Sequence, residues 1–274
     1  MPFIRTPRHL AVLTLPLLLA ACAGTPQAPT SAADIGELRP GMLRGYLDRA
    51  VLPDSLALVP PPAADSPALA ADVAAYRATR ALLATPRGAL AKADARLDFP
   101  AAATAFACAA NLDIAADTMP HLYTLMRRTL VDAGLSTYRA KDHYQRMRPF
   151  VLHQDVSCTP DEEARLAKDG SSPSGHSALG WAWALVLAEL MPERSDALLQ
   201  RGHAFGQSRV VCGVHWQSDV EAGRVMGAAA VARLHVDPVF QAQLGAAAGE
   251  IRNARSAGRG ARKDCTAEAA ALAR

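Results

Sequence analysis

Apolar residues recur along this chain at the three-to-four-residue spacing of helices, and no segment alternates with the period of two that a half-buried strand requires. A clear stripe lies within 118–134, where the apolar positions would share one helix face. The stretch 177–191 is apolar on every side, which is typical of a helix buried in a core. Its strongly apolar part, 181–191, is shorter than the roughly 20 residues that span a bilayer. The pattern therefore predicts an all-α, single-domain bundle around a central buried helix.

Caps and helix breakers set the limits of the other predicted helices. Ser66 precedes Pro67 and Asp237 precedes Pro238, in each case an N-cap followed by proline at the first helical position. The segment Thr159-Pro160-Asp161-Glu162 has the pattern of a capping box. The predicted helices are a short one within 40–58, then 67–84, 88–96, 101–116, 119–133, one that follows Ser136 and ends before Pro149, a short one after Thr159, then 177–191, 195–208, 216–234 and 238–256.

Composition supports this fold class and argues against one class of partner. The 274 residues show no internal repeat and no interior low-complexity linker, so we expect one domain. Alanine is abundant and aromatic residues make up 5%, which favours helices over sheets. The net charge of +3 is small, and no basic stripe with interleaved aromatics is present, so we expect no nucleic acid partner.

The first residues have the pattern of an export signal. Arg5 and Arg8 precede the apolar run Leu10–Leu19, which is too short for a membrane span. The run ends in Leu19-Ala20-Ala21-Cys22, which resembles a bacterial lipobox and implies cleavage before Cys22 and diacylation of its thiol. Ala23 then favours an anchor in the outer membrane, by analogy with other lipoproteins; ordinary cleavage nearby would instead give a soluble periplasmic protein. We predict a signal peptide of lipoprotein type at 1–21, a flexible tether at 22–36, a folded domain at 37–256 and a C-terminal tail at 257–274.

Four further cysteines predict disulfides. Cys108, Cys158, Cys212 and Cys265 form an even set in a chain predicted to be exported, so we expect two bonds, and three pairings exist. We favour Cys158–Cys212 with Cys108–Cys265, because the first bond would brace two loops beside the candidate site. No close cluster of cysteines and histidines indicates a metal site.

Candidate chemistry concentrates in the segment 208–219, which has the pattern Ser-Arg-x5-His-x3-Asp. If His215 opens a helix, Asp219 lies one turn further on the same face. A carboxylate on one ring nitrogen fixes the tautomer and leaves the other nitrogen free to act as a nucleophile. Arg209 would hold an anion through charge-assisted hydrogen bonds.

Two more segments supply parts of an anion site. The small-residue loop 170–176 runs into the apolar stretch, and backbone N–H groups at such a helix start suit a phosphate. Ser174 and Gly175 would contact that phosphate, and His176 stands where a proton donor is needed. Upstream, Lys141 and Arg148 are seven residues apart, which on a continuous helix would place both cations on one face.

Together, Lys141-x6-Arg148-Pro149, Pro173-Ser174-Gly175-His176 and Ser208-Arg209-x5-His215-x3-Asp219 resemble the three signature blocks of the phosphatidic acid phosphatase type 2/haloperoxidase superfamily. The flanking residues narrow the resemblance to class A bacterial non-specific acid phosphatases over about 46–251. The resemblance implies a helical bundle of the phosphatidic acid phosphatase type 2/vanadium haloperoxidase type. It implies metal-independent hydrolysis of phosphomonoesters, without a cofactor, through a phosphohistidine. It implies His215 as nucleophile, His176 as general acid and base, Asp219 as the orienting carboxylate, and Lys141, Arg148, Ser174, Gly175 and Arg209 as phosphate ligands.

The resemblance leaves several questions open. Class A relatives usually carry Tyr where Ser172 stands, which would widen the leaving-group side of the pocket. A vanadate-dependent haloperoxidase, a membrane lipid phosphatase and a non-catalytic phosphate-binding lipoprotein are the alternatives. The expected partners are small phosphomonoesters such as nucleotides, sugar phosphates or aryl phosphates, with membrane contact only through the lipid anchor. Phosphotransfer to alcohols and a homo-oligomeric state stay open, and an acidic optimum follows if His176 is the limiting acid.

Overall fold

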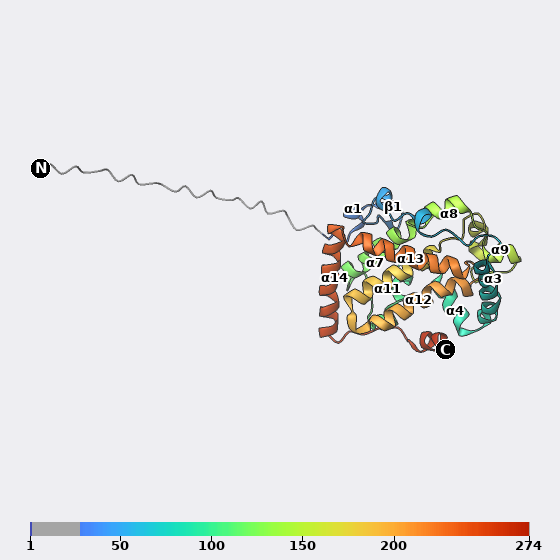
Figure 1. Cartoon of the computed structure of the whole chain (residues 1–274). Helices are drawn as coiled ribbons and strands as arrows, with labels where there is room; N and C mark the ends of the chain where they lie inside the picture. Colours follow the sequence, from blue (N-terminus) through green and yellow to red (C-terminus); the bar gives the residue numbers. More distant parts are fainter. Residues whose placement is uncertain (2–27, 274) are drawn as a thin grey trace.

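A computed structural model describes Met1 and residues 28–273 of the chain (Figure 1). The predicted signal peptide, apart from Met1, and residues 22–27 of the predicted tether, which include the lipidation site Cys22, therefore lie outside the described residues. Within 28–273, no helix is both long enough and apolar enough to cross a membrane.

Helix α11 (Gly175–Leu190) runs through the middle of the helical bundle (Figure 1). Ser174 caps its start, where the Ser174 hydroxyl accepts a hydrogen bond from the Ser177 N–H at 3.2 Å. The helix packs mainly against α12 (Ser195–Val211), α13 (Gln217–Leu234) and α7 (Pro120–Leu135). Its Trp183 ring is buried in the main core, and the indole N–H donates to the Met126 carbonyl at 2.9 Å. The apolar stretch predicted from sequence is therefore the central buried helix.

The remaining elements surround these four helices. They are α1 (Ala32–Ile35), β1 (Glu37–Arg39), β2 (Met42–Leu43), η1 (Arg49–Val51), α2 (Ser55–Leu58), α3 (Pro67–Thr79), η2 (Arg80–Ala84), α4 (Pro86–Asp94), α5 (Ala101–Thr104), α6 (Ala107–Ala110), α8 (Tyr138–Tyr144), α9 (Pro149–His153), η3 (Pro160–Glu162), α10 (Glu163–Leu166), η4 (Pro192–Arg194), α14 (Pro238–Ser256) and α15 (Thr266–Leu272).

Two glycines let α13 approach the start of α11. They lie four residues apart, so they share one face of α13. A Cβ atom at Gly223 would lie 2.5 Å from the Ser174 carbonyl oxygen, and one at Gly227 would lie 2.3 Å from the Ala178 carbonyl oxygen. Only glycine fits at these contacts, and the close crossing brings the first turn of α13 against the loop that precedes α11.

The structure differs from the predicted elements in several places. Strands β1 and β2 form a small antiparallel hairpin that the absence of period-two alternation did not indicate, since strands this short carry too few residues to show a pattern. The predicted helix 101–116 is broken into α5 and α6. Thr159 makes no capping hydrogen bond, and its own N–H, which Glu162 would accept in a capping box, donates to the Ser157 hydroxyl at 3.1 Å.

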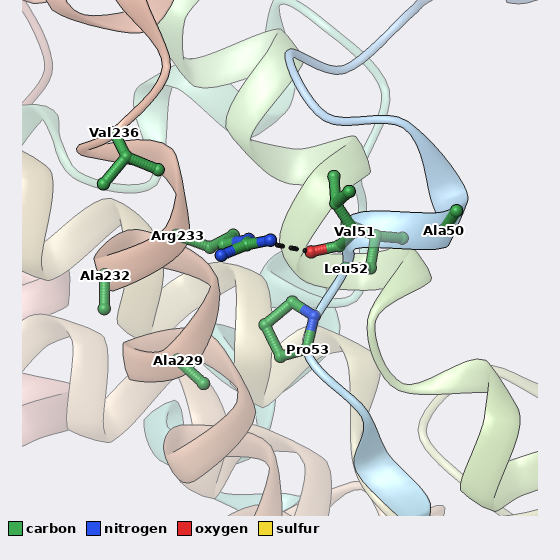
Figure 2. Close-up of a pocket in the computed structure, with 8 residues that line it drawn as sticks. All are labelled: Ala50, Val51, Leu52, Pro53, Ala229, Ala232, Arg233 and Val236. Carbon is green, nitrogen blue, oxygen red and sulfur yellow. Dashed lines mark hydrogen bonds between the residues drawn. The ribbon is translucent and has the colours of Figure 1, made fainter.

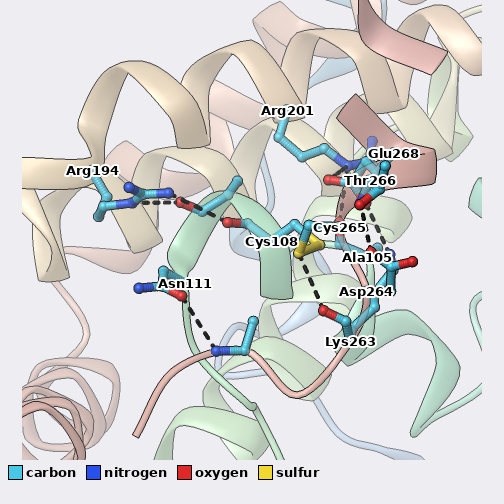
Figure 3. The surroundings of a disulfide bond; sticks show 12 residues. Ala105, Cys108, Asn111, Arg194, Arg201, Lys263, Asp264, Cys265, Thr266 and Glu268 are labelled. Carbon is cyan, nitrogen blue, oxygen red and sulfur yellow. Dashed lines mark hydrogen bonds and ion pairs between the residues drawn. A yellow bond between two sulfur atoms is a disulfide. The ribbon is translucent and has the colours of Figure 1, made fainter. Parts of the chain in front are cut away.

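Both favoured disulfides form. Cys158 and Cys212 are bonded with Cα atoms 4.6 Å apart, which ties the loop after α9 to the end of α12. Cys108 and Cys265 are bonded with Cα atoms 5.6 Å apart, which holds the C-terminal segment and α15 beside α6 (Figure 3). Next to this bond, Arg201 lies 3.4 Å from Glu268 of α15.

Candidate active site

Arg209 is a buried cation in the last turn of α12. Its side chain is 1% exposed, yet its Nε and Nη1 groups have no hydrogen-bond partner among the described residues. Burial is the main cause that lowers the pKa of Arg209 from 12.5 to about 10, and the neighbouring charge of Arg148 contributes to this lowering. Buried N–H groups are almost always paired, so unpaired ones on a cation indicate a site for an anion.

The side chains of Arg148 and Lys141 both contact backbone carbonyl groups of the segment 166–170, which precedes the loop into α11. The Lys141 ammonium donates to the Gly170 carbonyl at 2.6 Å, and Arg148 Nη2 lies 3.4 Å from the same oxygen. Arg148 also donates to the carbonyl groups of Leu166 and Asp169 at 2.8 and 3.0 Å. Burial is the main cause that lowers the pKa of Lys141 to about 8, and the adjacent Arg148 charge adds to it.

The two cations do not share a helix, so that part of the prediction is wrong. Helix α8 ends at Tyr144, because Gln145 adopts a left-handed conformation with φ 43° and ψ 40°. Arg148 is extended, with φ −75° and ψ 150°, as the residue before a proline prefers. Lys141 therefore reaches the site from α8 and Arg148 from the start of α9, and they converge through their contacts with Gly170.

The loop that enters α11 lies against α13. The Ser174 N–H donates to the Asp219 carbonyl at 2.9 Å, and the Ser177 hydroxyl donates to the Val220 carbonyl at 2.7 Å. The Gly175 and His176 N–H groups occupy the first two helical positions, where an α-helix offers no internal partner. A bound anion would meet these groups and the positive end of the helix dipole.

His176 stands at this helix start and contacts α4 by its ring. Its Nε2 lies 3.0 Å from the Ala95 carbonyl, so Nε2 carries the proton and Nδ1 is the nitrogen left for proton exchange. Burial, followed by the charge of Arg209, lowers the pKa of His176 well below 6.5. The charges of His215 and Arg148 also lower the pKa of His176.

His215 lies in the turn before α13, not inside a helix as the spacing suggested. Its Nε2 lies 3.1 Å from Arg148 Nη1, and a guanidinium only donates, so Nε2 is unprotonated and Nδ1 carries the proton. Nδ1 is 3.5 Å from Asp219 Oδ2. Burial and the charges of Arg148, Lys141 and Arg209 lower the pKa of His215 well below 6.5. The ring is therefore neutral near neutral pH, with a lone pair on the nitrogen that faces the cations.

The three signature segments thus fold into one cluster. It contains three cations, two histidines and the carboxylate of Asp219, drawn from α8, the start of α9, the start of α11, the end of α12 and the start of α13. His176 is half-buried and the other members are buried. Residues 118–241, which include all three segments, match the model of the PAP2 superfamily.

Curated relatives cover most of the chain. A "Non-specific acid phosphatase" of Providencia stuartii is 45% identical over 201 residues, which is 73% of this chain and 81% of that protein. An "Acid phosphatase" of Zymomonas mobilis is 42% identical over 201 residues, 73% of this chain and 76% of that protein. A "Non-specific acid phosphatase" of Salmonella typhimurium is 43% identical over 188 residues, which is 68% of this chain and 75% of that protein.

The chain belongs to the class A non-specific acid phosphatases of the PAP2 superfamily. Enzymes of this family are phosphomonoesterases, and the all-α fold is the one expected for the superfamily.

Two charged residues that contact Asp219 or its neighbours were not predicted from the sequence. Arg146 lies inside the segment 141–149, but no role was predicted for it. Its guanidinium is 11% exposed and donates to Asp219 at 2.6 Å and to Asp72 at 2.7 Å. Asp72 belongs to α3, outside every signature segment, and no local pattern marks it.

A cavity of about 530 Å³ lies elsewhere, between η1 and the end of α13 (Figure 2). Arg233 points into it and donates to the Val51 carbonyl at 3.2 Å, while its other lining residues are alanine, valine, leucine and proline. None of the sequence-predicted site residues lines this cavity, so we do not assign the chemistry to it.

Proposed function

We propose that this chain hydrolyses small phosphomonoesters through a phosphohistidine on His215. The observation that carries the proposal is Arg209, a buried guanidinium with two unpaired N–H groups whose charge acts on both histidines. A dianionic phosphoryl group would supply the missing partners and neutralise the cluster. Stabilisation of charge on the phosphoryl oxygens is the dominant contribution in phosphoryl transfer.

In the first step, Nε2 of His215 attacks phosphorus in line, and the bond from phosphorus to the ester oxygen breaks. Lys141, Arg148 and Arg209 bind the equatorial oxygens, together with Ser174 and the Gly175 N–H. Arg148 Nη1 moves its hydrogen bond from His215 to a phosphoryl oxygen. His176 gives its proton to the leaving alkoxide, so that an alcohol departs.

In the second step, neutral His176 takes a proton from water, and the resulting hydroxide attacks phosphorus. The bond from phosphorus to His215 breaks, and inorganic phosphate leaves. Asp219 stabilises the positive charge that the ring carries while it is phosphorylated, as the carboxylate of a catalytic triad does. An alcohol in place of water would give phosphotransfer by the same route.

The pKa of His176 predicts the direction of the pH dependence. His176 must be protonated in the first step, and both burial and the Arg209 charge disfavour that form. A bound phosphoryl dianion would offset the Arg209 charge, but acid would still be required. We therefore expect kcat/KM to fall as pH rises toward neutrality.

We also propose export to the periplasm and lipidation of Cys22, since the leader pattern supports both. Small phosphate esters present in that compartment would be the substrates. Mass spectrometry of the mature N-terminus tests this part separately from catalysis, because a lipid-free N-terminus would disprove lipidation and leave the mechanism untouched.

The test of the function is hydrolysis of an aryl phosphate between pH 4 and 9, with and without a chelator. We expect turnover that is fastest in acid, is insensitive to chelation and is inhibited by vanadate. Binding of phosphate without turnover, or peroxide-dependent oxidation of halide in the presence of vanadate, would contradict the proposal.

A further inference from the structure

A buried chain of charged groups extends behind His215, away from the phosphate cluster. Asp219, on the first turn of α13, is 0% exposed. Its Oδ2 accepts from the Trp216 N–H at 2.9 Å and faces His215, while Oδ1 accepts from Arg146 Nη1 at 2.6 Å. The two oxygens of this carboxylate therefore have different partners, and the Arg146 guanidinium fixes which oxygen faces the imidazole.

Arg146 is held in turn by Asp72 of α3. Its Nη2 donates to Asp72 Oδ2 at 2.7 Å, and its Nη1 also donates to the Ser218 hydroxyl at 2.8 Å. Asp72 accepts from the Ser218 N–H at 2.7 Å and from the Ser218 hydroxyl at 2.5 Å. Asp72 is 2% exposed, so solvent hardly screens these contacts. The guanidinium also lies over the Trp216 ring, 5.5 Å from its centroid.

The summed charge of Asp219, Arg146 and Asp72 affects the stability of the phosphoenzyme. Arg146 alone beside Asp219 would cancel the negative charge that a phosphorylated His215 needs. Asp72 restores it, because two carboxylates and one guanidinium sum to a single negative charge behind the ring. Arg146 also keeps the Asp219 carboxylate from turning, because it binds Oδ1 while Oδ2 accepts from the Trp216 N–H and faces His215.

We propose that Arg146 and Asp72 are positioning residues for the His215–Asp219 pair, acting on the formation and stability of the phosphohistidine without touching the substrate. The inference rests on the proposed function. It adds a residue of α3 to those that act on the reaction, and α3 lies outside residues 118–241, which match the superfamily model.

The test compares Arg146→Lys and Asp72→Asn with the wild-type enzyme. Lysine keeps the positive charge but lacks the planar guanidinium whose two Nη groups bind the two carboxylates. Asparagine keeps the shape of aspartate but removes its charge. We expect Arg146→Lys to lower kcat about 10- to 100-fold and Asp72→Asn to lower it about tenfold, the usual range for groups that orient a reacting residue. KM and the inhibition constant of inorganic phosphate should change less than about twofold, because the phosphate ligands are untouched.

The matched control is Asp132→Asn. Asp132 is also buried, and it accepts from the Tyr46 and Leu47 N–H groups at 2.8 and 3.1 Å, and none of these three is a residue of the proposed site. This variant should unfold at a lower temperature with kcat unchanged, so a loss of stability alone does not explain a lower kcat. The double variant Arg146→Lys/Asp72→Asn should be no slower than Arg146→Lys, because both changes break one chain of contacts.

Unchanged kcat in the folded Asp72→Asn and Arg146→Lys variants would overturn the inference. So would a loss of phosphate affinity as large as the loss of kcat, since that marks general damage to the site. If Arg146→Lys does not fold, Asp72→Asn decides by the same criteria. A wild-type enzyme that turns over but never forms a phosphohistidine would overturn the proposed function, and this inference with it.

Discussion

Replacement of Arg209 by methionine should make the unliganded protein more stable while destroying its activity. Each buried polar group without a partner costs about 1–3 kcal/mol, and Arg209 has two such nitrogens, Nε and Nη1. The lowering of its pKa from 12.5 to about 10 independently corresponds to about 3 kcal/mol of burial cost. Because the charged form is disfavoured in the fold, this cost is fully present below about pH 10 and fades only as the pH rises above that value.

Methionine removes the charge but fills the space less completely, which costs about 1 kcal/mol. The net gain is therefore about 2 kcal/mol, or a rise of about 4–8 °C in Tm for a chain of this size. Activity should move the other way, with kcat/KM reduced about 100- to 1,000-fold, as when one donor to a developing oxyanion is removed.

The assay is thermal unfolding with and without inorganic phosphate, alongside aryl phosphate kinetics. Phosphate at 100 times its Kd should stabilise the wild type by about 2.7 kcal/mol, and the Arg209→Met variant by far less. The control is Arg201→Met, since Arg201 is equally buried but fully paired with Asp94 and the Ala105 carbonyl. That variant should lose about 3–5 kcal/mol. An Arg209→Met protein that is less stable than the wild type, and equally stabilised by phosphate, would refute the reasoning.

Three further predictions concern the rest of the site. Lys141 must be charged to bind an anion and its pKa is lowered to about 8, so the inhibition constant of sulfate should rise as pH increases through about 8, and Lys141→Arg should move that rise to higher pH. Gly223→Ala would place a Cβ 2.5 Å from the Ser174 carbonyl, so thermal unfolding should show a loss of about 1–3 kcal/mol and phosphate affinity should fall; unchanged affinity would mean that the loop does not move. Replacement of Cys158 and Cys212 by serine removes a disulfide between residues 54 positions apart, which restricts the unfolded chain. The change should lower the free energy of unfolding by up to about 4 kcal/mol, measured by denaturant unfolding.

Local signals predicted the helices well, because a cap or a proline acts within one turn. Ser66 and Asp237 cap α3 and α14 as their side chains suggested, and Ser174 caps α11. The Cys158–Cys212 pairing was also predicted, since it joins two loops that flank the site.

The features that the sequence did not predict depend mainly on contacts between residues far apart in the chain. The spacing of Lys141 and Arg148 suggested one helix, but a left-handed Gln145 ends it, and the two side chains meet only through Gly170. Asp72 contacts Ser218 across 146 residues, and no periodicity encodes such a pairing. The hairpin of β1 and β2 is too short to leave a pattern.

The central claim is that His215 becomes covalently phosphorylated. The most direct test is to mix the enzyme with an aryl phosphate, quench within milliseconds at alkaline pH, and locate the phosphate by mass spectrometry of the peptides. The account predicts an acid-labile phosphate on His215 that is absent from His215→Ala, and that accumulates further in a His176→Ala variant supplied with a substrate whose leaving group needs no proton. Phosphate on another residue, or near-normal turnover by His215→Ala, would contradict it.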